Sequence, residues 1–273
     1  MSRTPKYFTV KDVFRAVGRA CSVPWEASAL PVCSRGRIAR SLRVIAGLLY
    51  GHAALADLSG SLVFTTNYIY RGYSKSNDNP VGQGNLEYAH EGGAYGGLWV
   101  SQVNFGDHDF PDSTRVELNP YLGWVHSISE DWRGEVSIGG YIYPGKISGV
   151  DSSYAEYYLS LHYSDFLTAR WAFAPNAFNR DATTFDYELM GRYSFLDTLQ
   201  GSLGVGFNQA YELLYSNYPY WTVGLTWYPW NFLALDLRYI GTALKSDSHQ
   251  GDDHYFAPGT LDTPIQFTLT LGF

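Results

Sequence analysis

The stretch PIQFTLTLGF, residues 264–273, alternates apolar and polar side chains and finishes on an aromatic residue. Successive side chains of a β-strand point to opposite faces. One face of this segment therefore carries Ile265, Phe267, Leu269, Leu271 and Phe273, and the other carries Gln266, Thr268 and Thr270. A membrane barrel turns the first kind of face to lipid and the second to a polar lumen. The edge strand of a soluble sandwich shows the same alternation, so this segment favours a barrel and leaves the sandwich open.

The N-terminal region has the layout of an export signal. Four arginines between positions 35 and 43 precede a short apolar run, and Ala54 and Ala56 supply the small residues of a cleavage site before Asp57. The run is shorter than the roughly 20 residues that a spanning helix needs. We therefore predict a cleaved Sec signal peptide over residues 35–56 and a mature domain over residues 57–273.

Residues 1–34 precede the basic region of this signal, where export signals seldom carry so long a segment. We interpret them as the product of a start codon placed too early or as a dispensable extension, with a genuine long leader as the alternative. Both cysteines, Cys21 and Cys33, lie in this segment, so the mature chain contains none.

The mature chain is acidic and rich in aromatic residues. Without residues 1–56 it has ten basic and 24 acidic residues, a net charge of −14, which excludes nucleic acid as a partner because the phosphate backbone would repel it. Aromatic residues make up 17% of the full sequence. Tyr and Trp favour membrane interfaces, where barrels carry aromatic girdles. The composition therefore agrees with a membrane barrel.

Alternation with a period of two recurs along the mature chain and predicts twelve strands. Their expected bounds are 58–71, 81–90, 94–104, 114–126, 131–143, 153–163, 166–174, 185–194, 200–209, 219–227, 231–240 and 263–273. Bacterial single-chain barrels have an even number of strands, and most of these segments are long enough to cross a bilayer at a tilt. The expected fold class is all-β: a transmembrane, antiparallel, up-and-down β-barrel of about 12 strands.

Short and long connections alternate between the predicted strands. Connections after even-numbered strands have five residues or fewer, whereas those after odd-numbered strands are longer and are expected at 72–80, 105–113, 144–152, 175–184, 210–218 and 241–262. Outer-membrane barrels have short periplasmic turns and longer extracellular loops. A soluble sandwich has no reason to keep this order, so the connections favour the barrel.

Charged residues within the predicted strands fall on the face opposite the apolar one. They are Glu117, Glu135, Glu156, Arg170, Asp186, Glu188, Arg192, Asp236 and Arg238, with Arg71 at the end of the first strand. Arg or Lys on the lipid face near the bilayer midplane would cost about 2–4 kcal/mol, so we expect these side chains to point into the lumen. There they either line a solute path or pair into a network that fills it. Six acids against four bases predict a weak preference for cations.

The segment TNYIYRGYS, residues 66–74, belongs to a pattern that continues with NP at 79–80, QG at 83–84, YGGLW at 95–99, ELNPYLG at 117–123, YPG at 143–145, YAE at 154–156 and the terminal Phe273. This pattern resembles the TorF-type porins, a proteobacterial family catalogued as conserved proteins of unknown function. The resemblance covers most of residues 58–273 and implies an outer-membrane barrel with a role in transport, without a substrate or a catalytic residue. Pro120 lacks a ladder donor, which leaves open the local register and whether a bulge occurs there.

Together these observations predict an outer-membrane porin through which small hydrophilic solutes diffuse, with a weak preference for cations. The alternative is a non-conducting structural or surface-interaction barrel. The expected partners are outer-membrane lipid, small hydrophilic solutes or ions, and the barrel-assembly machinery, which typically reads a terminal Phe such as Phe273.

No catalytic residue, metal or cofactor is predicted. A barrel phospholipase needs Ser and His at one depth on the lipid face, whereas His126 is expected at the periplasmic end beside Ser127, His162 is expected to face inward, and no G-x-S-x-G elbow occurs. Two loops, 107–109 and 247–254, combine His and Asp, but neither spacing matches a strong metal motif. Both are interpreted as solvated polar loops.

Overall fold

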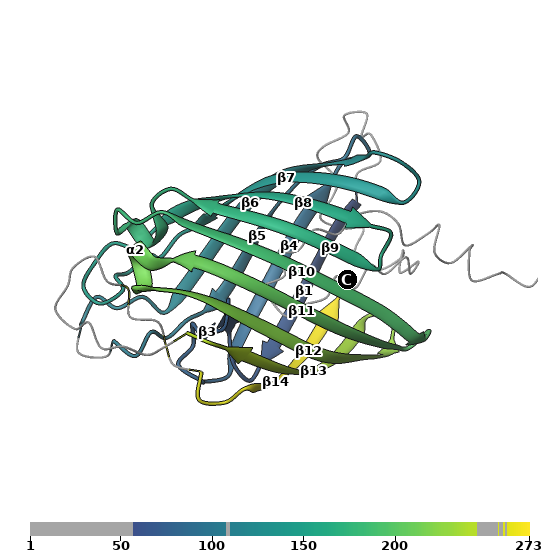
Figure 1. Ribbon diagram of the computed structural model, residues 1–273. Coiled ribbons are helices and arrows are strands. Elements are labelled where there is room, and N and C mark those ends of the chain that lie inside the picture. The colour runs from purple at the N-terminus through teal and green to yellow at the C-terminus, as the bar shows by residue number, and fades with distance from the viewer. Residues whose placement is uncertain (1–56, 108–109, 245–255, 257–258, 260) are drawn as a thin grey trace, which may run out of the picture.

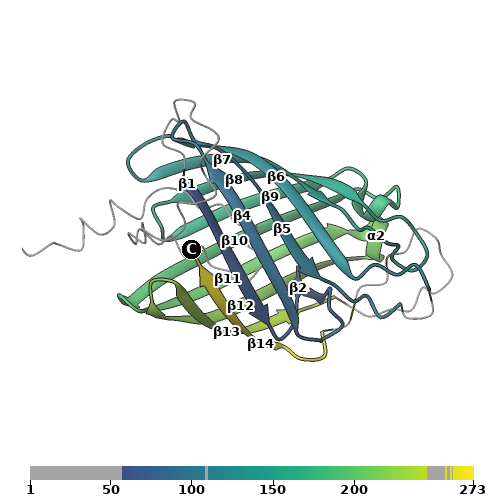
Figure 2. The ribbon, with the colours of Figure 1, turned by 180° about the vertical axis from the view of Figure 1, so that it is seen from behind.

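Twelve antiparallel strands close into one barrel, in which each strand pairs with its neighbours along the chain and the first pairs with the last (Figure 1, Figure 2). The computed structural model describes residues 57–273 except 108–109, 245–255, 257–258 and 260, so the predicted extension and signal peptide lie outside the described residues. The strands are β1 (Asp57–Thr65), β4 (Val81–Ala89), β5 (Ala94–Gln102), β6 (Val116–Ser127), β7 (Trp132–Tyr141), β8 (Tyr154–Tyr163), β9 (Leu167–Ala174), β10 (Thr184–Leu196), β11 (Leu199–Ala210), β12 (Ser216–Trp230), β13 (Leu233–Thr242) and β14 (Ile265–Gly272). The predicted fold class is confirmed.

The barrel is apolar outside and polar inside. On β14, Ile265, Phe267 and Leu271 are exposed and Leu269 is half-buried, whereas Gln266, Thr268 and Thr270 are buried in the interior. Every other strand of the barrel also exposes large apolar side chains on its outer face. Because a bilayer requires an apolar wall around a closed hydrogen-bonded sheet, this surface is suited to lipid.

The last residue completes the closure of the barrel. The amide nitrogens of Phe273 and Gly60 each donate to the other's carbonyl oxygen at 3.0 Å, next to the pairing of Ser61 with Gly272. A Cβ atom on Gly60 would lie 2.5 Å from the Phe273 ring. The absence of a side chain at Gly60 therefore leaves room for the terminal aromatic side chain against β1.

The two ends of the barrel differ in their connections. The short turns 90–93, 128–131, 164–166, 197–198 and 231–232 lie at one end, which we call the turn end. The connections 66–80, 103–115, 142–153, 175–183, 211–215 and 243–264, as far as their residues are described, lie at the other, which we call the loop end. The predicted alternation is confirmed. The connection between β11 and β12 is shorter than expected because both strands extend toward α2 (Tyr211–Leu214), a single helical turn that marks the loop end in Figure 1.

The predicted first strand is too long. β1 ends at Thr65, and residues 66–80 turn inward and form a small hairpin of β2 (Ile69–Tyr70) and β3 (Tyr73–Ser74). The alternation of Tyr68 and Tyr70 continues the period of the strand, but both rings are buried and neither faces lipid. Aromatic side chains that are buried against interior partners can show the same alternation along the sequence as side chains that face lipid.

Pro120 does not disturb the register. It pairs with Leu98 of β5, and on its other side the pairs Leu118 with Ile142 and Tyr121 with Gly139 keep one register across it. The side-chain amide of Asn119 donates to the Gly140 carbonyl at 3.1 Å, close to where the proline offers no donor. The register therefore continues across Pro120 without a bulge.

No helix in the described part of the chain is long and apolar enough to cross a membrane.

Candidate functional site

Residues 66–80, which we call the inner loop, cross the lumen at the loop end. The hairpin reverses at Arg71 and Gly72, whose φ angles are +45° and +82°. A Cβ atom on Gly72 would lie 2.6 Å from the Thr242 hydroxyl oxygen and 3.0 Å from the Tyr220 Cβ, so the tip lies against β12 and β13. The loop starts between β1 and β4 and reaches strands on the other side of the barrel. The turn therefore needs glycine for both its conformation and its close approach.

Arg71 binds two carboxylates on the barrel wall. Its Nη1 lies 2.8 Å from Glu156 Oε1 on β8, and its Nε lies 3.5 Å from Asp186 Oδ2 on β10. The three side chains are at most 3% exposed. Its guanidinium also lies over the Tyr70 ring, 4.7 Å from the centroid. A buried charge needs such partners, so these contacts hold the tip of the inner loop in place.

Lys75 lies in a cage of aromatic rings and one carboxylate. Its Nζ is 3.0 Å from Glu117 Oε2 and 3.3 Å from the Tyr143 hydroxyl oxygen, and both charged side chains are 0% exposed. The same nitrogen lies 3.9 Å from the ring centroid of Tyr70 and 4.6 Å from that of Tyr141. Distances below about 6 Å are typical of cation–π contacts. The ammonium group thus exchanges its hydration shell for one anion and several π-faces.

The tyrosines of this cage are neutral hydrogen-bond donors. The hydroxyl of Tyr143 donates to Glu117 at 2.7 Å, and that of Tyr70 donates to Glu156 at 3.3 Å. Burial raises the pKa of Tyr70 and Tyr143 well above the ordinary value of a phenol. Both hydroxyls therefore stay protonated and give a second donor to carboxylate oxygens that also accept from Lys75 and Tyr158.

The base of the inner loop is held by uncharged groups. The Asn67 side-chain oxygen accepts from the hydroxyls of Ser74 at 2.6 Å and Ser76 at 2.9 Å, and the Asn67 carbonyl accepts from the Gln266 amide of β14 at 2.6 Å. The Ser74 amide donates to the Gly259 carbonyl at 3.2 Å. Among the described residues, Ser74–Gly259 is the one backbone bridge that β2 or β3 makes outside its own hairpin. No barrel strand depends on β2 or β3 for its ladder.

Aromatic rings from other connections cover the inner loop. Phe256 is fully buried and stacks on Phe178 of η1 (Ala177–Asn179), with 3.9 Å between ring centroids. Tyr73 and Phe105 contact Phe256 edge-on at 6.0 Å and 5.8 Å. The loop half of the lumen, meaning the part that contains the inner loop, is therefore closed by packed rings above buried ion pairs.

The lumen changes character toward the turn end, in the part that we call the turn half. His162 and Glu135 form a contact of 3.1 Å and have side chains 20% and 10% exposed. Arg170 Nε lies 2.8 Å from Glu188 Oε2, with side chains 12% and 9% exposed. All four side chains face inward, so this exposure opens onto the interior. The turn half holds accessible space that the loop half lacks.

Across the turn half, inward carboxylates of β4 and β7 face inward arginines of β10 and β13, two strands that also carry the paired carboxylates Glu188 and Asp236. Glu87 and Glu135 lie on β4 and β7, whereas Arg192 and Arg238 lie on β10 and β13, each six strands around the ring from an acidic counterpart. The guanidinium of Arg192 contacts Met190 Sδ at 3.3 Å. No salt bridge joins Arg192 to a carboxylate within the described residues. A solute that crosses this region would pass between the carboxylates of β4 and β7 and the arginines of β10 and β13.

The structure locates each of the ten charged residues that the sequence singles out. Nine lie in barrel strands on the face opposite the exposed apolar side chains, and Arg71 lies on the inner loop instead of at the end of β1. Asp236 and Arg238 pair with each other at 3.2 Å. The sequence argument missed Glu87, although the exposed Leu86 and Tyr88 on either side indicate its inward direction. It also missed Lys75.

Among the described residues, neither His126 nor His162 has the partners of a hydrolase site. His126 stacks on Trp124 at 5.1 Å near the turn end, and His162 faces inward against Glu135. Within the described residues no group of three His, Cys, Asp or Glu side chains could hold a metal ion. The loop 247–254 and residues 108–109 lie outside the described residues, whereas Asp107 accepts from the Ser148 amide at 3.0 Å.

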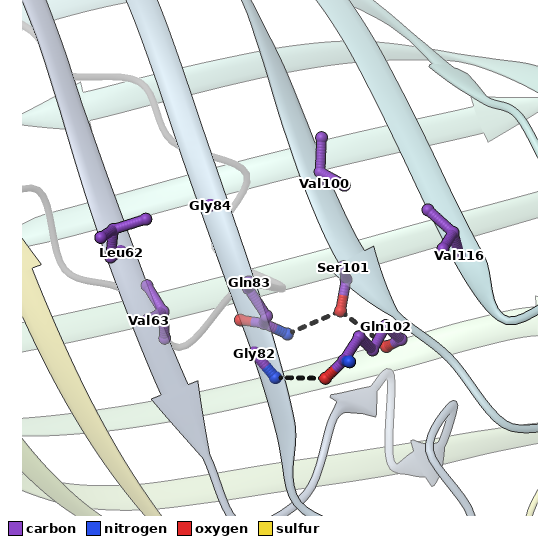
Figure 3. A pocket seen from close by; sticks show the side chains of 9 residues that line it. All are labelled: Leu62, Val63, Gly82, Gln83, Gly84, Val100, Ser101, Gln102 and Val116. Carbon is purple, nitrogen blue, oxygen red and sulfur yellow. Dashed lines mark hydrogen bonds between the residues drawn. The ribbon is translucent and has the colours of Figure 1, made fainter.

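A shallow depression on the outer wall is separate from the lumen (Figure 3). Gly82 and Gly84 form its floor and Leu62, Val100 and Val116 lie around it. The Gly82 amide donates to the Gln102 side chain at 2.9 Å. These are outward positions, so lipid covers the depression in a membrane.

A family described as a bacterial protein of unknown function (Gcw_chp) matches residues 51–267. The chain belongs to this family. The matched family and the family that the sequence resembles are both described as bacterial proteins of unknown function. Membership of the TorF-type porins stays a prediction. No curated protein matches the chain.

Several solved structures are similar to the barrel at low identity. The KdgM porin matches with a TM-score of 0.47 and 8% identity over 79% of this chain and 98% of that chain. The NanC porin matches with a TM-score of 0.45 and 8% identity over 79% and 98%. The outer membrane channel DcaP of Acinetobacter baumannii matches with a TM-score of 0.37 and 10% identity over 80% and 97%.

Proposed function

We propose that this family member is an outer-membrane channel for small hydrophilic solutes, closed at its extracellular side by the inner loop. The carrying observation is the contrast within the lumen: Lys75 and Glu117 are 0% exposed in the loop half, whereas His162 is 20% exposed in the turn half. Short turns are periplasmic in such barrels, so the turn half would face the periplasm. Export through cleavage before Asp57 and recognition of Phe273 by the assembly machinery belong to the same proposal.

The contacts that attach the inner loop favour a movable gate rather than a permanently fixed plug. Arg71, Lys75 and Asn67 hold it through ion pairs and hydrogen bonds, and its ends, Thr65 and Val81, are paired neighbours at the rim of the barrel. The loop can leave the lumen without breaking a strand pair of the barrel. Polar contacts of this kind can be exchanged for water or solute, which makes an open state accessible.

The second candidate is a non-conducting barrel with a structural or surface-interaction role. The observation that favours it is the burial of Glu117, Glu156 and Asp186, all paired with cations of the inner loop. Removing one member of a buried pair is costly, about 3–5 kcal/mol, so a loop held by two such groups could stay docked permanently.

Recordings of the purified full chain in planar bilayers separate the two candidates. A gated channel should show discrete current steps separated by long closed periods, because the docked loop is the favoured state. A barrel without current steps at any voltage that the bilayer tolerates, in the wild type and after removal of the inner loop, would contradict the channel.

Ion selectivity should depend on the opposed walls of the turn half. We expect Arg192→Gln to increase the preference for cations and Glu135→Gln to decrease it, since each removes one sign of charge from the path. The reversal potential in a salt gradient measures both. The two variants have matched chemistry, so shifts in the same direction, or no shift in either, would mean that ions do not pass between these walls.

A further inference from the structure

We propose that the solutes of this channel are organic cations with an ammonium or guanidinium group, and that the loop half binds them where Lys75 and Arg71 now lie. The inference rests on the proposed function, because it requires the inner loop to leave the lumen. In the docked state the loop's own side chains occupy two preformed cation positions, which the barrel wall and its connections supply in large part.

The ammonium position is built by three groups outside the inner loop. Glu117 of β6 lies 3.0 Å from Lys75 Nζ, the Tyr143 hydroxyl lies 3.3 Å away, and the Tyr141 ring centroid of β7 lies 4.6 Å away. The Tyr143 hydroxyl also donates to Glu117 at 2.7 Å, which orients the carboxylate without the lysine. These groups stay in place when the loop departs.

The guanidinium position lies between two strands. Glu156 of β8 and Asp186 of β10 both face Arg71, at 2.8 Å and 3.5 Å. The Tyr158 hydroxyl donates to Glu156 at 2.7 Å, and the Tyr220 hydroxyl donates to Asp186 at 2.9 Å. Asp186 Oδ1 is buried and accepts no hydrogen bond, so the wall offers one more acceptor than Arg71 uses.

Three carboxylates on this wall select for positive charge, and the aromatic rings select among cations. A small metal ion such as Na⁺ keeps a tight hydration shell and gains little from a ring face. Ammonium and guanidinium groups bind π-faces and accept the loss of part of their hydration. Anions would meet Glu117, Glu156 and Asp186 once the loop has left, and Arg170, a wall cation whose charge reaches Glu156 and Asp186, is already paired with Glu188. Organic cations are therefore the class whose binding replaces the ion pairs that departure of the loop breaks.

Binding at these positions also favours the open state. A solute that occupies them competes directly with Lys75 and Arg71, so it binds the undocked state and shifts the population toward it. The channel would then open more often in the presence of its own solute.

The test uses agmatine, which carries a guanidinium at one end and an ammonium at the other. The full chain is compared with the double variant Arg71→Ser/Lys75→Ser, which empties both positions, by calorimetry in detergent. Agmatine should bind the double variant at least about tenfold more tightly than the wild type, because the competing side chains are gone. In that background Glu117→Gln and Glu156→Gln should each weaken binding about tenfold.

Glu130→Gln, at an exposed carboxylate in the turn 128–131, is the matched control and should leave binding unchanged. Glutamate and glucose are the anionic and neutral comparison solutes. The inference would be overturned if agmatine bound the wild type and the double variant with equal affinity. It would also be overturned if neither Glu117→Gln nor Glu156→Gln changed the affinity for agmatine. If the double variant does not assemble, as judged by heat-modifiable gel mobility, Lys75→Ser alone empties the ammonium position and the same comparison decides.

Failure of this inference and failure of the channel proposal give different results. A barrel that conducts but binds agmatine no better than glucose is a channel for other solutes. A barrel that binds agmatine through Glu117 and Glu156 but shows no current is a receptor-like barrel, and the channel proposal is then wrong.

Discussion

Replacing residues 67–78 with a short Gly-Ser linker should turn a barrel that conducts rarely into one that conducts continuously. The linker joins β1 and β4 at Thr65 and Val81, which already pair across the two strands, so closure of the barrel is preserved. Removal takes Arg71 and Lys75 out of the lumen together with the rings of Tyr68, Tyr70 and Tyr73, which are buried there. Side chains fill barrels of about eight strands, whereas twelve strands enclose more space than the wall residues alone fill. The mean current at fixed voltage measures the effect.

The matched control changes the inner loop without emptying the lumen. Asn77 lies in the loop at φ +51°, a conformation that glycine adopts without strain, and its side chain is exposed. Asn77→Gly should keep the rare openings of the wild type. Equal currents for the control and the loop replacement, in barrels that both show heat-modifiable mobility, would mean that the inner loop does not close the channel.

The strands could be predicted from the sequence because the surroundings of a barrel wall impose them. Lipid on one side and a polar lumen on the other force a period of two, so the two faces of β14 and the inward direction of Glu117, Glu156 and Asp186 follow from the order of residues alone. Connection lengths added an independent constraint. Both signals act locally, within one strand or between neighbours.

The inner loop could not be predicted in the same way, because its partners are distant in sequence. Arg71 meets Glu156 and Asp186, and Lys75 meets Glu117, contacts that no local pattern encodes. Tyr68 and Tyr70 even continue the alternation of the strand before them. The signal that was present is turn chemistry: Arg71-Gly72 interrupts the run with a residue that tolerates positive φ. This pair marks the reversal of the inner hairpin, six residues after β1 ends at Thr65.

The buried pair of Lys75 and Glu117 should show strong coupling. Lys75→Met removes the cation and leaves a carboxylate that is 0% exposed, which should destabilise the docked loop by about 3–5 kcal/mol. Glu117→Gln in the same chain removes the uncompensated charge, and its amide oxygen can still accept from one of the two hydroxyls that now donate to Glu117, that of Tyr68 to Oε1 at 2.9 Å or that of Tyr143 to Oε2 at 2.7 Å. The double variant should therefore recover most of the docking stability that the single variant loses.

The frequency of channel openings reports this coupling directly. A loss of 3 kcal/mol changes the ratio of docked to undocked loop more than a hundredfold, so Lys75→Met should open far more often than the double variant. Cleavage by chymotrypsin after Tyr68 or Tyr70, both buried in the docked state, gives a second readout that needs no membrane potential. If the two substitutions act additively, each weakening docking regardless of the other, then Lys75 is held mainly by the aromatic rings. The pair with Glu117 would in that case contribute little to closure.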